Sequence, residues 1–145
     1  MQGDIIPIAC DHGGFKMKQF LIEKLKELGY EVKDYGCFSE ESVDYPDFIH
    51  PLASDIEHGV YKRGIILCGS GNGAQMTANH HPHVRAALCW SVEICKYARM
   101  HNDANIISLP GRFISNEKAW EIVKTYLSTE FEGGRHQRRI EKIDL

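Results

Sequence analysis

A glycine-rich hexapeptide carries the residue types that most clearly suggest chemistry: Cys68-Gly69-Ser70-Gly71-Asn72-Gly73. Its glycines allow the backbone to approach a ligand closely, and the helix expected to follow directs free N–H groups and a partial positive charge at that ligand. A helix N-terminus stabilises a thiolate, so Cys68 could act as a base or a nucleophile. The same N–H groups would stabilise an oxyanion formed during a reaction. A tight structural turn with a buried cysteine is the alternative interpretation.

The hexapeptide does not match the common nucleotide-binding or hydrolase motifs. A dinucleotide fingerprint needs a third glycine where Met76 stands, and a P-loop needs Gly-Lys where this chain has Ala74-Gln75. A nucleophile elbow needs glycine two residues before its serine, and Cys68 occupies that position. These comparisons exclude those three motifs as the origin of the loop.

Two further polar groups lie beside expected strands. Asp11-His12 follows the apolar run 5–9 and Cys10, and could orient a substrate or contact a phosphate, although a helix-capping aspartate with an exposed histidine explains the same pattern. His101-Asn102-Asp103 ends an expected helix before the last strand, which places it at the amino edge of the sheet. If His101 works with Cys68, a second chain would have to deliver it. The alternative is a surface histidine that compensates the helix dipole.

The tail that begins at about residue 133 concentrates positive charge. If this segment is helical, Arg135 and Arg139 share one face and can hold a phosphate group. A solvated tail and a nucleic-acid-binding patch are the alternatives. The net charge of −3 counts against nucleic acid as a partner.

The remaining histidines and cysteines are interpreted as structural. His80-His81-Pro82-His83 lacks a fourth ligand at finger-type spacing, so we expect a surface loop and assign no metal. Five cysteines without a paired spacing indicate reduced thiols in a cytosolic protein. Apart from Cys68, we expect them to be small buried hydrophobic residues: Cys10, Cys37, Cys89 and Cys95.

The elements that position these residues alternate between strands and helices. The patterns predict strands over 5–9, 30–35, 64–67, 84–89 and 104–109, and helices over 15–28, 46–58, 73–79, 91–100 and from 115. Short apolar strands that are each followed by an amphipathic helix predict a three-layer, doubly wound, Rossmann-like α/β sandwich with a five-stranded parallel sheet. Such sheets bind ligands beyond the carboxyl ends of their strands, which selects residues 10–14, 68–73 and 110–112.

Composition favours one ordinary globular domain over residues 1–145. Hydrophobic residues make up 43% and charged residues 26% of the 145 positions, and 17 Lys and Arg face 20 Asp and Glu. The sequence has neither an apolar run long enough to span a bilayer nor the pattern of a signal peptide. We therefore expect a cytoplasmic protein without a membrane partner.

Five blocks, in order along the chain, resemble type B ribose-5-phosphate isomerases, whose wider family includes galactose-6-phosphate and allose-6-phosphate isomerases. The blocks are Asp11-His12, Asp44-Tyr45-Pro46-Asp47, the hexapeptide, His101-Asn102-Asp103 and residues 132–139. The resemblance covers nearly the whole chain. It implies a phosphorylated sugar as substrate, a homodimer that often pairs into a tetramer, active sites shared between subunits, and neither a metal nor an organic cofactor.

The resemblance also implies roles for individual residues. Cys68 would move a proton between C1 and C2 of the open-chain sugar, with Ser70 supporting its thiolate, and the backbone of residues 69–73 would stabilise the enediolate. His101 would open the sugar ring, with Asp11 on the other side of the sugar. Tyr45 and Asn102 would touch the substrate, and the phosphate would be held by His12, Arg112, Arg135 and Arg139.

These expectations lead to one hypothesis and two alternatives. The hypothesis is an aldose–ketose isomerase of carbohydrate metabolism that interconverts ribose 5-phosphate and ribulose 5-phosphate through an enediolate. A branch of the family uses a glutamate where this chain has Ala74, so the resemblance places the chain in the cysteine branch. The alternatives are a hexose-6-phosphate isomerase and a non-catalytic sugar-phosphate-binding protein.

Overall fold

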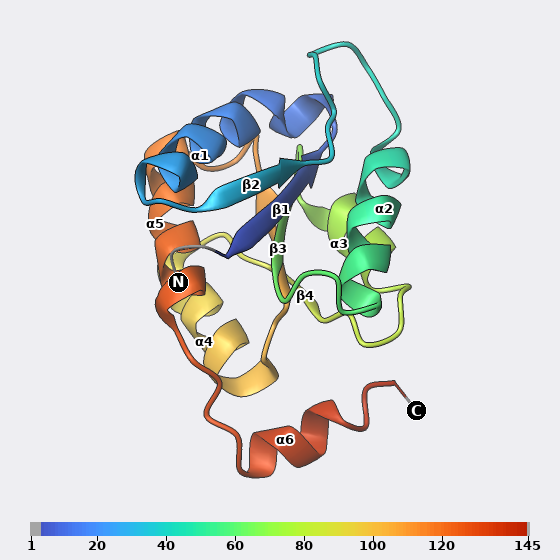
Figure 1. Ribbon diagram of the computed structural model, residues 1–145, viewed down its shortest axis with the longest axis vertical. Helices are drawn as coiled ribbons and strands as arrows, with labels where there is room; N and C mark the ends of the chain where they lie inside the picture. The colour runs from blue at the N-terminus through green and yellow to red at the C-terminus, as the bar shows by residue number, and fades with distance from the viewer. Residues whose placement is uncertain (1–3, 145) are drawn as a thin grey trace.

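A five-stranded parallel sheet forms the centre of the protein in a computed structural model that describes residues 4–144. The strands are β1 (Ile5–Cys10), β2 (Glu31–Asp34), β3 (Gly64–Cys68), β4 (Ala86–Leu88) and β5 (Ile106–Pro110), in the order β2-β1-β3-β5-β4. The helices are η1 (His12–Gly14), α1 (Phe15–Glu27), α2 (Tyr45–Glu57), α3 (Asn72–Ala78), α4 (Val92–Asn102), α5 (Asn116–Ser128) and α6 (Arg135–Ile140). Helices α1, α4 and α5 cover one face of the sheet, and α2 and α3 cover the other (Figure 1). The prediction of a doubly wound, Rossmann-like sandwich is confirmed.

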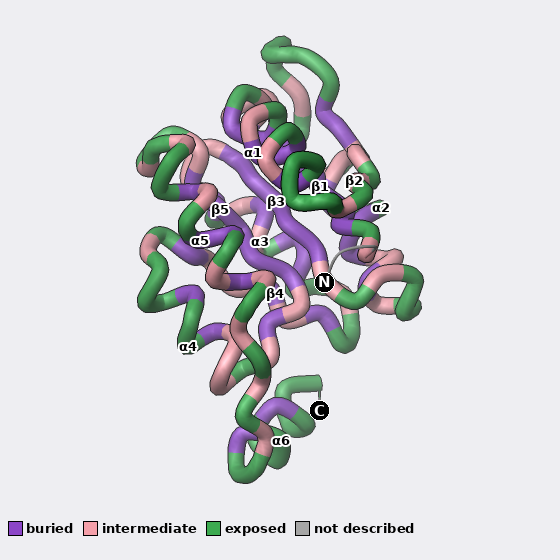
Figure 2. The backbone as a smooth tube through the Cα atoms, turned by 60° about the vertical axis from the view of Figure 1, so that its left-hand side comes forward, coloured by how far each residue is buried: buried purple, intermediate pink, exposed green. Residues whose placement is uncertain are grey.

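Alternation of side chains along the central strands divides the apolar interior into two cores. In β3, Ile65 and Leu67 belong to the core shared with α1, α4 and α5, whereas Ile66 and Cys68 belong to the core shared with α2 and α3. All five residues of β3 are buried, and the buried path of the backbone through the middle of the molecule is visible in Figure 2. Strand β3, which is apolar on both faces, therefore lies at the centre of the sheet, where a parallel sheet is covered on both sides.

Two hydroxyl caps and one glycine define helix ends close to the predicted positions. The Ser91 Oγ accepts a hydrogen bond from the Ile94 N–H at 3.2 Å, and the Ser115 Oγ accepts one from the Lys118 N–H at 3.0 Å. Gly29 has a φ of +92° just after α1, a conformation that favours glycine. None of the helices within residues 4–144 has the length and apolarity needed to cross a bilayer.

The last two strands differ from the predicted ranges. The strand expected over 84–89 is only Ala86–Leu88, because the Arg85 N–H donates to the Asn105 side-chain oxygen at 2.7 Å instead of entering the sheet. Strand β5 begins at Ile106, later than expected, and extends to Pro110. Both strands still run parallel in the predicted sheet, so these differences concern only the ends of the elements.

A buried ion pair joins the first helix to the end of β2. The Lys18 side chain is fully buried in α1, and its Nζ lies 2.7 and 2.8 Å from the two carboxylate oxygens of Asp34. Asp34 also accepts a hydrogen bond from the Gly36 N–H at 2.9 Å. A buried ammonium group needs a close countercharge. The pair of Lys18 with Asp34 therefore fixes the position of α1 relative to the chain that leaves β2.

We expect Asp34→Asn to lower the free energy of unfolding by about 2–3 kcal/mol, because the buried Lys18 ammonium loses its countercharge. Urea denaturation measures the change. The control is Glu40→Gln, which removes the exposed pair of Glu40 with Lys16 (3.5 Å apart), and its expected effect is below about 0.5 kcal/mol. Equal losses in the two variants would contradict a special role for the buried pair.

Candidate active site

Three loops meet at the carboxyl edge of the sheet, after β1, β3 and β5. The Gly111 N–H donates to the Cys68 carbonyl at 2.9 Å, and the Arg112 N–H donates to the Gly69 carbonyl at 2.9 Å. The Asp11 N–H donates to the Leu67 carbonyl at 3.3 Å. These backbone bonds fix the loops to one another, as the rule for ligand sites in open parallel sheets predicts.

The approach of the three loops leaves no room for side chains at the points of contact. A Cβ atom on Gly13 would lie 2.9 Å from the Gly69 nitrogen, and one on Gly111 would lie 2.8 Å from the Gly13 oxygen. Both distances are shorter than real Cβ contacts, and the neighbouring atoms belong to the backbone. Glycine is thus required at these positions by close packing.

Two side-chain hydrogen bonds hold the glycine-rich loop, one from within the loop and one from β5. The Ser70 Oγ accepts a hydrogen bond from the Asn72 N–H at 3.2 Å, and Gly71, with a φ of +78°, precedes α3. From the fully buried interior of β5, the Ser108 hydroxyl donates to the Gly71 carbonyl at 2.7 Å. Sequence analysis did not single out Ser108, although a lone hydroxyl in the apolar run of β5 was a usable signal.

Cys68 differs from the other cysteines in its position. It is the last residue of β3, 4% exposed, where the strand passes into the glycine-rich loop. The other four thiols are buried, as predicted, but they form two pairs that the sequence did not reveal. The Sγ atoms of Cys10 and Cys37 lie 3.9 Å apart, and burial, followed by the charge of Cys37, raises the pKa of Cys10.

The second pair is Cys89 and Cys95, which lie in the core that α4 shares with α1 and α5. The hydrogen bond between the Cys89 and Cys95 thiols, followed by burial, raises the pKa of Cys89. A raised pKa keeps a thiol protonated and unreactive at neutral pH. These contacts support a structural role for the paired thiols.

Asp11 and His12 are oriented by the backbone around them. The Asp11 carboxylate accepts a hydrogen bond from the Gly13 N–H at 2.8 Å and so caps η1, as the helix-capping interpretation predicted, but His12 is half-buried and not exposed. The His12 Nδ1 accepts a hydrogen bond from the Val43 N–H at 3.1 Å. With Nδ1 occupied as an acceptor, the Nε2 of His12 is the nitrogen that can donate a proton to a ligand.

Two cavities open beside these residues. One of about 440 Å³ is lined by His12, Gly13, Gly111 and Arg112, among others. The other, of about 480 Å³, is lined by Asp11, His12 and Tyr45, among others. The ring of Tyr45 lies directly against Gly73, where a Cβ would be 2.5 Å from the ring Cζ. The carboxyl edge therefore brings together the predicted residues Asp11, His12, Tyr45, Cys68 to Gly73, and Arg112.

The other predicted residues lie at the opposite end of the molecule. Helix α4 ends at Asn102 before β5 begins, so His101 and Asn102 are at the amino edge of the sheet, as expected. Helix α6, which carries Arg135 and Arg139, packs there against the end of α4, far from the carboxyl ends of the strands (Figure 1). One chain alone does not bring His101, Asn102 and the two arginines to Cys68.

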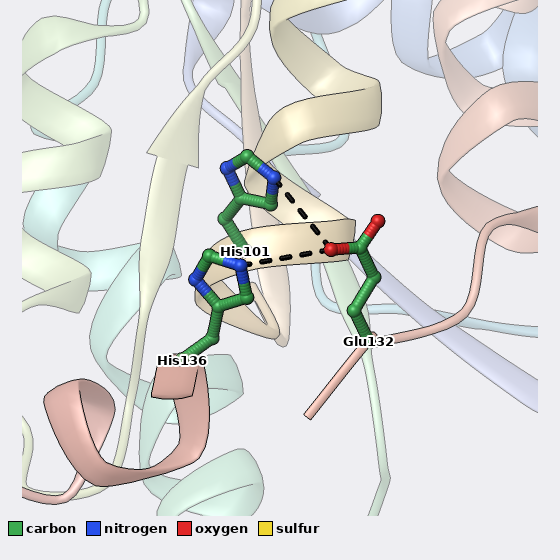
Figure 3. Close-up of side chains that lie close together, drawn as sticks. All are labelled: His101, Glu132 and His136. Atoms are coloured by element: carbon green, nitrogen blue, oxygen red, sulfur yellow. Dashed lines mark ion pairs between the residues drawn. The ribbon is translucent and has the colours of Figure 1, made fainter. Parts of the chain in front are cut away.

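Figure 3 shows a three-residue cluster at this amino edge. The His101 and His136 rings are stacked, with centroids 4.3 Å apart and an interplanar angle of 11°. Burial, followed by the charge of protonated His101, lowers the pKa of His136. Glu132 lies beside both rings. Sequence analysis missed this cluster because His101 is distant in the sequence from Glu132 and His136, although the latter two are only four residues apart.

The histidine segment 80–83 forms a turn at the surface, as predicted, but His81 is more engaged than a solvated loop residue. Its Nε2 lies 2.8 Å from the His50 Nδ1, and its Nδ1 lies 3.0 Å from the Glu57 carboxylate. These contacts attach the turn to α2.

Comparison with known proteins shows which family the chain belongs to. The family described as Ribose/Galactose Isomerase matches residues 6–143. Ribose-5-phosphate isomerase B of Escherichia coli (strain K12) is 38% identical over 138 residues, which cover 95% of this chain and 93% of that protein.

Two solved structures are similar over nearly their whole length. A ribose 5-phosphate isomerase of Thermotoga maritima is 48% identical with a TM-score of 0.96, and the match covers 99% of each chain. Ribose-5-phosphate isomerase B of Mycoplasma genitalium, solved with bound ribulose 5-phosphate, is 39% identical with a TM-score of 0.93 over 99% of this chain and 95% of that one. The chain therefore belongs to the ribose/galactose isomerase family, among the type B ribose-5-phosphate isomerases, and is a sugar-phosphate isomerase.

Proposed function

We propose that the protein interconverts ribose 5-phosphate and ribulose 5-phosphate, with Cys68 as the base. The observation that carries the proposal is the thiol of Cys68 at the end of β3, beside a loop whose backbone N–H groups precede α3. The names of the Escherichia coli and Thermotoga maritima relatives, and the ribulose 5-phosphate bound to the Mycoplasma genitalium protein, support this choice of substrate.

In the proposed reaction, the Cys68 thiolate removes the proton from C2 of the open-chain aldose. The electron pair of that C–H bond forms the enediolate, whose oxygen is stabilised by N–H groups of residues 69–73. A proton then passes from the C2 hydroxyl to the C1 oxygen, and return of the abstracted proton to C1 gives the ketose. The Ser70 hydroxyl, whose oxygen accepts from the Asn72 N–H, keeps its own proton free to donate to the thiolate.

Phosphate binding is assigned to positive groups remote from the reacting carbons. His12 has a free Nε2 donor, and Arg112 lies against the glycine-rich loop, where its side chain would be 3.3 Å from a Cβ on Gly69. Arg135 and Arg139 stand one turn apart on α6. Binding energy from the phosphate holds the sugar in place for proton transfer.

If His101 and Cys68 act on one sugar, their separation within the chain means that a second subunit supplies one of them. Cys68 lies at the carboxyl edge and His101 at the amino edge of the same sheet. In a homodimer, the ends of α4 and α6 from one chain would reach the carboxyl edge of the other, so that His101 opens the ring of a sugar held beside the partner's thiol. Asp11 would stand on the other side of that sugar, and Tyr45 and Asn102 would contact it.

The first test follows hydrogen exchange by NMR while the protein acts on ribose 5-phosphate in D₂O. We expect ketose to form and deuterium to appear at C2 of the recovered aldose. Cys68→Ala should lower kcat by about 100-fold or more with little change in KM, because it removes the base. Cys95→Ala, a buried thiol in the other core, is the control and should keep its kcat.

Ribose 5-phosphate that stays unconverted and unexchanged would contradict the proposal. Parallel reactions with allose 6-phosphate and galactose 6-phosphate would identify a hexose-6-phosphate isomerase, which the family description also allows. Wild-type activity in Cys68→Ala would remove this thiol as the base.

For phosphate binding, the informative variant is Arg139→Ala. We expect KM for ribose 5-phosphate to rise about 10-fold or more, because a charge-assisted contact to phosphate is lost. Arg138→Ala, an exposed arginine of the same helix without an assigned contact, should leave KM unchanged. Steady-state kinetics on both variants decides the assignment, and equal KM values would count against it.

Shared sites can be tested by mixing two inactive variants, Cys68→Ala and His101→Asn. Each mixed dimer would contain one intact site, so random pairing should restore about a quarter of the wild-type rate. The rate is measured after the two chains are unfolded and refolded together. Failure of the mixture to exceed the separate variants would contradict a site shared between two chains.

A further inference from the structure

Three potential metal ligands converge at the amino edge. His101 comes from α4, Glu132 from the segment before α6, and His136 from α6, and their ligand atoms all lie within 4.8 Å of one another. The Glu132 Oε1 is 3.8 Å from the His101 Nε2 and 3.6 Å from the His136 Nε2 (Figure 3). Two imidazoles and one carboxylate form a donor set that suits zinc.

His136 supplies an independent observation. Its side chain is only 8% exposed, and its Nε2 is buried without a hydrogen-bond partner in the part of the chain that the structure describes. The nearest carboxylate oxygen, at 3.6 Å, is beyond hydrogen-bond distance. A buried polar atom left unpaired has a free-energy cost that a bound ligand can remove.

The spacing of the cluster fits a bound ion after a small adjustment. Zinc bonds of about 2.0–2.2 Å place tetrahedral ligand atoms about 3.4 Å apart, close to the separations from Glu132. The stacked rings of His101 and His136 must tilt before their nitrogen lone pairs point at one ion. His101 can tilt, because its side chain is 37% exposed, whereas His136 is fixed by packing.

We propose that His101, Glu132 and His136 form a Zn²⁺ site whose occupation inhibits the isomerase. The site leaves a fourth position to water. The inhibitory part rests on the proposed function, since zinc would occupy the Nε2 of His101, the residue assigned to ring opening. The positive charge of Arg135 and Arg139 on the same helix opposes a cation, so the anionic Glu132 is an essential member of the set.

Binding is tested by calorimetric titration of the intact protein with ZnCl₂, without any substrate. We expect one zinc ion per chain, with affinity lowered about 10-fold or more in Glu132→Gln and in His136→Asn. Glu132 is exposed, so its variant should fold even if the buried His136 does not tolerate change. Co²⁺ in place of zinc should give visible absorption bands that both variants lose.

Two control variants address the other groups that could bind zinc. His81→Asn removes the contact between His81 and Glu57, and Cys68→Ala removes the thiol at the carboxyl edge. Both should keep the wild-type zinc affinity. Unchanged binding in Glu132→Gln and His136→Asn, or loss of binding in Cys68→Ala, would overturn the site.

The activity measurement is read separately from binding. Zinc should slow ribose 5-phosphate isomerisation in the wild type, and Glu132→Gln should need about 10-fold more zinc for the same fractional loss of its own rate. Zinc bound at this site without any effect on turnover would overturn the inhibitory role. If no sugar phosphate is converted at all, the proposed function fails, while calorimetry and the cobalt spectrum still decide the zinc site.

Discussion

Close backbone contact between loops at the carboxyl edge is the constraint on which the arrangement of the site depends. Gly13, Gly69 and Gly111 come from three different strand ends, and their backbones approach too closely for any side chain to intervene. Their hydrogen bonds then fix the positions of Cys68 and Arg112 relative to each other. A site that must stabilise developing charge benefits from this rigidity, because donors held in place need no rearrangement during the reaction.

The same sheet separates groups that the proposed chemistry would use together. Its carboxyl edge holds the thiol and the glycine-rich loop, while its amino edge holds His101 and the arginines of α6. The positive charge of the two α6 arginines is thus kept away from Cys68 within one chain, where Arg112 is the arginine beside the glycine-rich loop. On the proposed function, assembly of two chains would complete the site by bringing ring opening and phosphate binding to the carbon chemistry.

The fold was predictable to the extent that it rests on local patterns. Ser91 and Ser115 mark helix starts, and short apolar runs mark the central strands, because capping and burial act over a few neighbouring residues. The length of β4 was not predictable in this way, since the distant Asn105 side chain takes the Arg85 N–H that would have extended the strand.

In the candidate site, too, local patterns were predictable and contacts between residues distant in the sequence were not. The hexapeptide and Asp11-His12 could be located from spacing and from the position of strand ends. The hydrogen bond from Ser108 to Gly71, the thiol pair Cys10–Cys37 and the cluster around Glu132 join residues distant in the sequence. Such contacts depend on the packing of layers, which no local pattern records.

Alternation along β3 has a consequence for how such a protein can change over evolutionary time. Cys68 belongs to the layer of α2 and α3, together with Tyr45 of α2 beside the glycine-rich loop, whereas His101 belongs to the layer of α4 on the other face. Within one chain the buried sheet lies between the two layers, so a substitution beside the thiol need not disturb the end of α4. On the proposed function the two surfaces would meet across a dimer, so a lineage that remodels one of them must keep it complementary to the other.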